Sequence, residues 1–323
     1  AAYILEFGPL TIRFFVNEGQ LATGGSTVQV TSTYTAAQLP DLQYAQSADV
    51  LWLVHPDHHP KKLTRTSSTA FALADVVWRG GAGPLRPQNL TATTITATKP
   101  GTPVILTFSV AQVFTAGADV GRIIRHTKGS ATAWYKVTAV TSTTILEATL
   151  MGGATTVGGG ADADWALGLF SNTEGPRAVT FHQGRLCYGG TSTEPDRLVL
   201  SAPDDYDSFP LVTDKSLSSA ENADNAISRR VTNGKMNAIQ FLASAAKKLT
   251  IATRGGEFSA TSVGEFVAPL DMAILPVAER GAAHAMPVTV GANIVFLERN
   301  KRSIRELGQF ASPTTGYLEE IPR

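Results

Sequence analysis

Residues 178–190 read Ala178-Val179-Thr180-Phe181, a polar break, and then Arg185-Leu186-Cys187-Tyr188-Gly189-Gly190. A short apolar strand, a tight turn and a second apolar strand are typical of a β-hairpin. After a charged turn the pattern continues with a third segment, Arg197–Ser201. Short strands joined in this way predict an antiparallel meander.

The same plan recurs three more times along the chain. The other units begin at Leu42–Gln46, Ala238–Leu242 and Pro287–Val290. Repeats of three or four antiparallel strands at a period of about 50 residues are the plan of a propeller blade. The sequence therefore predicts an all-β fold with a propeller-like body of antiparallel blades. The best helix candidate, Ala36–Leu42, is limited to about one turn by Pro40.

One interval between these units is too long for a single blade. The excess corresponds to residues 84–175, which are rich in Thr, Ala and Gly and carry strand patterns of their own. We expect them to form a small β-sandwich or open barrel inserted into the propeller-like platform, whose two parts are residues 1–83 and 176–323. Because the chain lacks an initiator Met and starts within a hydrophobic pattern, we expect it to be a fragment of a longer protein.

The composition excludes several classes of protein. The chain has 323 residues, of which 43% are hydrophobic and 17% charged, and its 27 Lys and Arg equal its 27 Asp and Glu. This balance excludes a disordered chain. It also argues against a dedicated nucleic-acid binder, which carries a basic excess.

A single cysteine, Cys187, excludes a disulfide framework and a thiolate zinc site. Its apolar surroundings predict a small buried side chain rather than a reactive thiol. No apolar run is long enough to span a bilayer. No signal peptide is visible, since residues 1–7 read as a strand.

A histidine-rich stretch is the first candidate for chemistry. His55, Asp57, His58 and His59 lie within five positions and carry nitrogen and oxygen donors that suit zinc. Pro56 and Pro60 impose an extended, turn-like path, however, and no helical pair of histidines is present. We interpret the stretch as a polar inter-strand turn, and metal binding by it stays open.

Two acidic clusters suggest paired carboxylates, as in a glycoside hydrolase. Asp162 and Asp164 follow a glycine-rich segment, and Asp204, Asp205 and Asp207 lie in a turn pattern. Neither matches the twelve-residue calcium loop. We interpret both as solvated turns, with calcium binding and glycan cleavage as the alternatives.

The remaining polar motifs favour structural roles. His182, His126 and His284 have no accompanying nucleophile motif, and residues 155–160 lack the Gly-Lys-Ser/Thr of a phosphate loop. The glycine pairs after Arg79 and Arg254 are expected to supply positive φ in tight turns. We interpret the dispersed basic pairs as turn or edge-strand residues; they are Lys61-Lys62, Arg229-Arg230, Lys247-Lys248 and Lys301-Arg302.

An ordered set of segments resembles the nozzle proteins, also called tail tubular protein B, of short-tailed bacteriophages. The segments span nearly the whole chain; they are Ala2–Gly8, Ile12–Phe15, Leu42–Val50, His55–His58, Pro60–Arg65, Gly175–Leu186, Gly189–Thr191, Gly255–Phe258 and Lys301–Leu307. The insertion resembles the family loosely around Asp119–Arg122. His59, where the family pattern has proline, and Cys187, where it has a larger residue, depart from that pattern.

The resemblance implies a structural protein of the virion, with no catalytic, cofactor-binding or metal-binding residues to carry over. Such proteins form homohexameric rings in the viral tail. The rings join the portal and adaptor proteins to tail fibre or tail-tip proteins, and they surround a channel for genome ejection. Zero net charge is compatible with DNA passing through such a channel without being retained. The alternative is a β-propeller tail enzyme or lectin that acts on surface glycans through Asp204, Asp205 or Asp207.

Overall fold

The chain is built almost entirely from β-strands. The structure, a computed structural model, describes residues 2–87, 89, 92–98, 103–112, 114–154, 160–211, 224–232, 238–262, 266–269, 271–309 and 318–322. Within these residues the helical elements are short: η1 (Leu39–Asp41), η2 (Arg79–Gly81) and α1 (Ala116–Asp119). No helix in this described part is long and apolar enough to cross a membrane.

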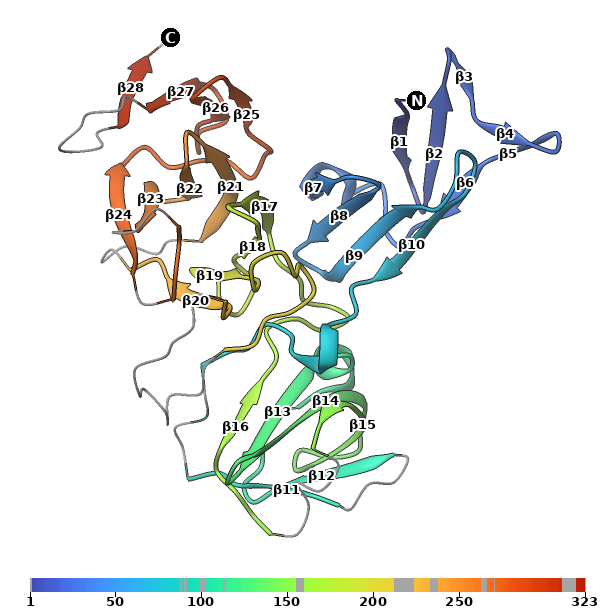
Figure 1. Cartoon of the computed structure of the whole chain (residues 1–323), viewed down its shortest axis with the longest axis vertical. Coiled ribbons are helices and arrows are strands. Elements are labelled where there is room, and N and C mark those ends of the chain that lie inside the picture. The colour runs from blue at the N-terminus through green and yellow to red at the C-terminus, as the bar shows by residue number, and fades with distance from the viewer. Residues whose placement is uncertain are drawn as a thin grey trace.

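Four antiparallel four-stranded sheets have the meander topology of propeller blades (Figure 1). In each of them the strands lie side by side in chain order. The first blade contains β7 (Gln43–Ser47), β8 (Val50–His55), β9 (His58–Arg65) and β10 (Phe71–Asp75); the second contains β17 (Ala178–His182), β18 (Arg185–Gly189), β19 (Arg197–Leu200) and β20 (Ile227–Arg230). The third contains β21 (Ile239–Ala245), β22 (Lys248–Thr253), β23 (Glu257–Ser262) and β24 (Met272–Ala278); the fourth contains β25 (Val288–Val290), β26 (Asn293–Leu297), β27 (Ile304–Gln309) and β28 (Leu318–Pro322). The predicted all-β, propeller-like fold is confirmed.

The blades are held face to face by side chains that alternate along each strand. In β18, Leu186 and Tyr188 point into a core shared with the first blade, whereas Cys187 points into a core shared with the third. Phe241 of β21 packs against Phe296 of β26 in a third core. Because successive side chains of a strand face opposite sides, one strand supplies both neighbouring cores.

The N-terminal residues form a separate sheet that covers the outer face of the first blade. It contains β1 (Ile4–Gly8), β2 (Thr11–Val16), β3 (Gly19–Gln20) and β6 (Gln29–Thr31), with the small hairpin of β4 (Ala22–Thr23) and β5 (Ser26–Thr27) beside it. The rings of Phe14 and Phe71 stack at 3.8 Å between centroids. Leu51 and Leu53 of β8 face this sheet, and Trp52 and Val54 face the second blade.

A six-stranded sheet lies between the first and second blades in the chain, at the bottom of Figure 1. Its order is β11-β12-β15-β14-β13-β16, formed by β11 (Ile95–Ala97), β12 (Val104–Phe108), β13 (Ile123–Lys128), β14 (Ala131–Val140), β15 (Ile145–Gly153) and β16 (Trp165–Leu167). Ile95 of one edge strand forms a β-bridge with Asp162, just before the other edge strand. The two edges therefore meet, and we call this unit the barrel.

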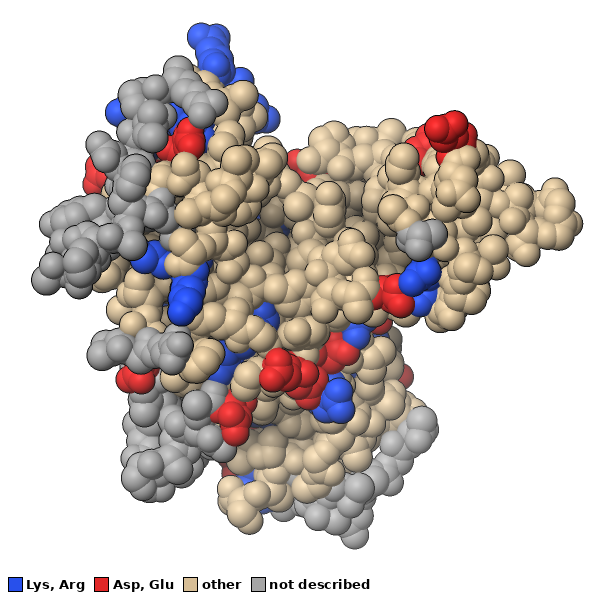
Figure 2. All heavy atoms as spheres, turned by 45° about the horizontal axis from the view of Figure 1, so that its top comes forward, with Lys and Arg blue, Asp and Glu red and all other residues tan. Residues whose placement is uncertain are grey.

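The barrel and the blades share one core. Ile123, Leu169 and Phe170 from the barrel and its exit segment belong to the cluster that contains Trp52 and Tyr188. Charged side chains of both signs are interspersed where the barrel meets the blades (Figure 2).

Three local expectations are corrected. The expected helix Ala36–Leu42 is a 3₁₀ turn over Leu39–Asp41, since proline removes a helix donor. The turn of the histidine-rich stretch contains only Pro56 and Asp57, because a register shift in the β8–β9 pair lets Pro60 continue the strand. Gly80 and Gly81 have the expected positive φ. Gly255 and Gly256 do not; instead, a Cβ at Gly256 would lie 2.7 Å from the carbonyl oxygen of Ala278.

Candidate functional site

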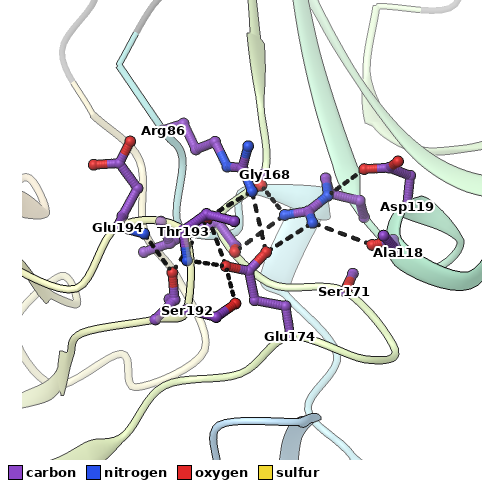
Figure 3. A network of polar contacts seen from close by, with 12 residues as sticks. Arg86, Ala118, Asp119, Gly168, Ser171, Glu174, Ser192, Thr193 and Glu194 are labelled. Carbon is purple, nitrogen blue, oxygen red and sulfur yellow. Dashed lines mark hydrogen bonds and ion pairs between the residues drawn. The ribbon is translucent and has the colours of Figure 1, made fainter. Parts of the chain in front are cut away.

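A buried ionic network joins the barrel to the second blade (Figure 3). Its centre is Glu174, which lies in the segment between β16 and β17 and is 4% exposed. Arg122, 2% exposed, precedes β13, and Arg86 lies between the first blade and the barrel. Thr193 belongs to the loop between β18 and β19. We call this set, with Ser192 and Asp119, the junction.

Both oxygens of the Glu174 carboxylate are engaged. Oε2 accepts hydrogen bonds from Arg122 Nη2 at 2.8 Å and from Arg86 Nη2 at 3.1 Å. Oε1 accepts from the backbone nitrogen and hydroxyl of Thr193, at 2.9 and 2.6 Å, and from the Ser192 hydroxyl at 3.0 Å. Charge-assisted bonds of this kind are the stronger class in proteins.

The guanidinium of Arg122 is fully used as well. It donates to Asp119 Oδ1 at 3.0 Å and to the carbonyl oxygens of Ala118, Gly168 and Leu169. A buried ion pair is favourable only when its remaining hydrogen-bonding groups are satisfied. For Arg122 they are satisfied by the nearby Asp119 and Ala118 and by Gly168 and Leu169, which lie 46 and 47 positions further along the chain, so the network fixes how these segments meet.

The pKa shift of Glu174 indicates that its carboxylate in the junction stays charged near neutral pH. Burial alone raises the pKa of Glu174, but the hydrogen bonds from Thr193 and Arg122 outweigh it and lower the pKa to about 2. Burial lowers the pKa of Arg86, and the neighbouring Arg122 lowers it further. A carboxylate this strongly stabilised in its charged form is poorly suited to exchange protons near neutral pH.

Besides the ionic network, aromatic rings pack the first blade against the second blade and against the segment that leaves the barrel. Trp78, which follows the first blade, lies 5.5 Å from Phe209 and 6.1 Å from Phe170 between ring centroids. Trp52 makes edge-to-face contacts with Phe181 and Tyr206 at 5.3 and 5.6 Å. The first blade, the second blade and the barrel exit are thus packed as one body.

The histidine-rich stretch forms an inter-strand turn at Pro56 and Asp57, as expected, but two of its three histidines are buried, which corrects its interpretation as polar. His55 and His59 are 2% and 5% exposed, and only Asp57 is well exposed. The backbone N–H of Asp57 donates to His55 Nδ1 at 3.1 Å, so the proton of the neutral ring belongs on Nε2. A histidine that ligates metal through one nitrogen donates from the other, so this hydrogen bond opposes a metal at Nε2.

Three of the five carboxylates in the acidic clusters pair with a cation, whereas Asp162 Oδ1 accepts a hydrogen bond from the backbone nitrogen of Asp164 at 2.8 Å. Asp164 is buried beside Arg125 at 3.2 Å, so it is not the solvated turn expected from the sequence. Asp205 pairs with Arg79 at 2.7 Å, and Asp207 pairs with Lys62 of β9. These carboxylates connect neighbouring segments.

The other histidines contact the framework. His182 Nδ1 lies 2.9 Å from the Ser244 hydroxyl of the next blade. His284 Nδ1 lies 3.0 Å from the carbonyl oxygen of Gln240, and its Nε2 lies 3.1 Å from that of Asp41. His126 is fully buried, and its ring nitrogens have no hydrogen-bond partner among the described residues.

The part of the chain that the structure describes contains neither an exposed cysteine thiol nor a cluster of metal-ligating residues. Cys187 is fully buried, as predicted, and burial raises the pKa of its thiol. No group of three His, Cys, Asp or Glu residues among the described positions is arranged to hold a metal ion. Residues 155–159 of the glycine-rich segment lie outside the described residues.

The structure also reveals a groove that the sequence did not predict. It has a volume of about 530 Å³ and lies between the N-terminal sheet and the first blade. Tyr3, Phe7 and Tyr44 line it, together with Asp49 and Arg65, which pair with each other at 2.6 Å.

Comparison with known proteins adds little beyond the blade topology. No protein-family model and no curated protein matches the chain. Among solved structures, an exo-1,5-alpha-L-arabinanase from a bovine ruminal metagenomic library is similar at 12% identity and a TM-score of 0.26, over 87% of this chain and 97% of that one. Hsv2p of Kluyveromyces lactis is similar at 10% identity and a TM-score of 0.21, over 87% of this chain and 96% of that one. At these TM-scores neither likeness bears on what the chain does.

Proposed function

We propose that this chain is a structural subunit of a bacteriophage tail that forms an oligomeric, nozzle-like ring around the DNA exit channel. The observation that carries the proposal is the ordered set of segments resembling the nozzle family. Several of these segments coincide with the framework described above: Leu42–Val50 includes β7, and Gly175–Leu186 runs from the junction into β17 and β18.

The framework suits a subunit that bears mechanical load. The blades share cores with their neighbours, and the junction ties the barrel to the second blade by buried charge-assisted bonds. Close-packed interiors have low compressibility and transmit strain. A ring of such subunits requires interfaces that close by rotation.

Partners and location follow from the same proposal. The ring would attach below the portal and adaptor proteins, carry tail fibre or tail-tip proteins, and contact phage DNA in transit within the virion. A homohexamer is the oligomeric state that the family resemblance implies.

The pairing of the acidic clusters favours this proposal over a glycan-cleaving enzyme. Such an enzyme needs one carboxyl group that gives up its proton and another that stays charged across the scissile bond. Asp205 and Asp207 each neutralise a cation of the first-blade region. A structural role accounts for these contacts directly.

Disruption of the gene in the phage tests the proposal. We expect filled heads that leak DNA or lack tail tips. Phage carrying Asp204→Asn and Asp205→Asn should assemble and adsorb like wild type, because the Arg79 side chain that pairs with Asp205 is largely exposed, and losing such a pair costs at most about 1 kcal/mol. Intact particles that fail to cleave or bind surface glycans would support the enzyme or lectin alternative and overturn the proposal.

A further inference from the structure

Three chain segments from two neighbouring blades bring five basic side chains to one place. Arg254 lies in the β22–β23 turn, Arg280 follows β24, and Arg299, Lys301 and Arg302 lie in the β26–β27 turn. All five are exposed. Figure 2 shows basic side chains at the β25–β28 end of the molecule, at the upper left. We call this set the basic patch.

Backbone hydrogen bonds hold the three segments together. Ala282 N donates to the carbonyl oxygen of Thr253 at 2.9 Å, and Arg299 N donates to that of Gly281 at 3.0 Å. Gly281 has a φ of 78°, and a Cβ there would lie 3.1 Å from Arg299 Cδ. The basic patch therefore stands on a fixed scaffold.

Four of the five basic side chains of the patch have no carboxylate partner among the described residues. Within the described residues, no carboxylate pairs with Arg254, Arg299, Lys301 or Arg302, and Glu279 is the exposed acid beside them in the sequence. Glu298 is 9% exposed and pairs with Arg305 at 2.9 Å.

Several basic side chains elsewhere in the chain are paired with carboxylates. Arg13, Lys61, Arg65 and Arg79 each pair with a carboxylate. In a chain of zero net charge, a local excess of this kind marks a surface that attracts anions.

We propose that the basic patch binds the phosphate backbone of double-stranded DNA. Four of its five cations are arginines, whose planar guanidinium groups match phosphate oxygens with paired hydrogen bonds. The patch extends over turns of two blades, which fits an extended polyanion better than a single phosphate group. The choice of DNA among polyanions rests on the proposed function, in which the genome passes the ring.

The basic patch explains how a subunit of zero net charge can contact DNA. Affinity from phosphate contacts falls steeply with salt because binding releases counterions. A few contacts per subunit, on an otherwise neutral wall, would guide the duplex and still let it move.

The test is fluorescence anisotropy of a labelled 30-base-pair duplex titrated with the purified chain between 50 and 200 mM NaCl. The variant R254Q/R299Q removes two charges from the patch. We expect weaker binding and a salt slope that falls by about 1.8 for each subunit in contact, since each phosphate contributes about 0.9. R254K/R299K should keep the slope while losing affinity.

The matched control is K247Q/K248Q. Lys247 lies in the β21–β22 turn and Lys248 begins β22, at the opposite end of the same blade from Arg254. We expect wild-type binding from this variant. No measurable binding at 50 mM NaCl, equal losses in the two Gln variants, or preference for dextran sulfate over the duplex would each overturn the inference.

The proposed function is tested separately, by examining the same samples for rings by electron microscopy. Rings that do not bind DNA overturn this inference and leave the proposed function standing. Patch-dependent DNA binding by a chain that never forms rings supports this inference and counts against the proposed function.

Discussion

Arg122 Nη2 lies 2.8 Å from Glu174 Oε2, and this buried pair links the start of a barrel strand to the segment that enters the second blade. Its two residues lie 52 positions apart in the chain. The pair therefore reports directly on whether barrel and blade are fixed to each other.

Glu174→Gln should strongly destabilise the protein. The substitution keeps the shape of the side chain but leaves Arg122 and Arg86 without their shared anion in a buried site. Breaking one partner of such a pair costs about 3 kcal/mol or more. Urea unfolding measures the loss in the free energy of unfolding.

Glu6→Gln, which breaks the exposed pair with Arg13, is the control and should cost at most about 1 kcal/mol. Equal effects of the two substitutions would contradict a structural role for the junction.

Stability should fall in two steps on acidification. His182 and His59 have a pKa lowered to about 4 by burial, so the unfolded chain takes up their protons first and stability falls as the pH drops from 6.5 toward 4. The pKa of Glu174 is about 2 against an ordinary 4.5, so its contribution is lost as the pH falls from 4.5 toward 2. Urea unfolding over a pH series measures both. His182→Gln should flatten the upper step and Glu174→Gln the lower one; a profile unchanged by either substitution would refute the assignment.

Gly175→Ala tests the contact between the junction and the histidine-rich turn. A Cβ at Gly175 would overlap the carbonyl oxygen of His58 and lie 2.5 Å from that of His55. Forcing atoms into a packed site costs about 1–3 kcal/mol. Thermal unfolding should show a lower Tm for this variant. Gly19→Ala, where a Cβ meets nothing within 4 Å, should leave Tm nearly unchanged.

Trp52→Ala tests the packing of the first blade on the second. Trp52 is 4% exposed, contacts Phe181 and Tyr206, and lies under the ammonium group of Lys62. Removing a buried aromatic ring costs about 3–5 kcal/mol. Tyr44→Ala, on the half-exposed face of β7, should stay within about 0.5 kcal/mol. If both substitutions have the same small effect in urea unfolding, the shared core is not intact.

The blades could be predicted from the sequence because their signals are local. Alternation along segments such as Arg185–Gly189 and short polar breaks between them determine where each strand begins and ends. The barrel could be predicted as an insertion because it interrupts a repeat. Its closure through Ile95 and Asp162 joins residues 67 apart in sequence, and no local pattern marks that bridge.

The junction and the basic patch could not be predicted for the same physical reason. Arg86, Arg122, Glu174 and Thr193 lie in different segments, and only the packed fold brings them together. Lys301 and Arg302 resemble an isolated basic pair until the turns of two blades bring Arg254, Arg280 and Arg299 beside them. The burial of His59 could not be predicted because Pro56 and Pro60 indicate a turn-like path, whereas a register shift lets Pro60 continue β9.

Negative-stain electron microscopy of the purified chain shows whether it forms rings. We expect closed rings of identical subunits around a bore wide enough for a DNA duplex, about 20 Å across on the scale of B-DNA grooves. A chain that stays monomeric at every concentration tested, and that binds or cleaves glycans in that state, would contradict it.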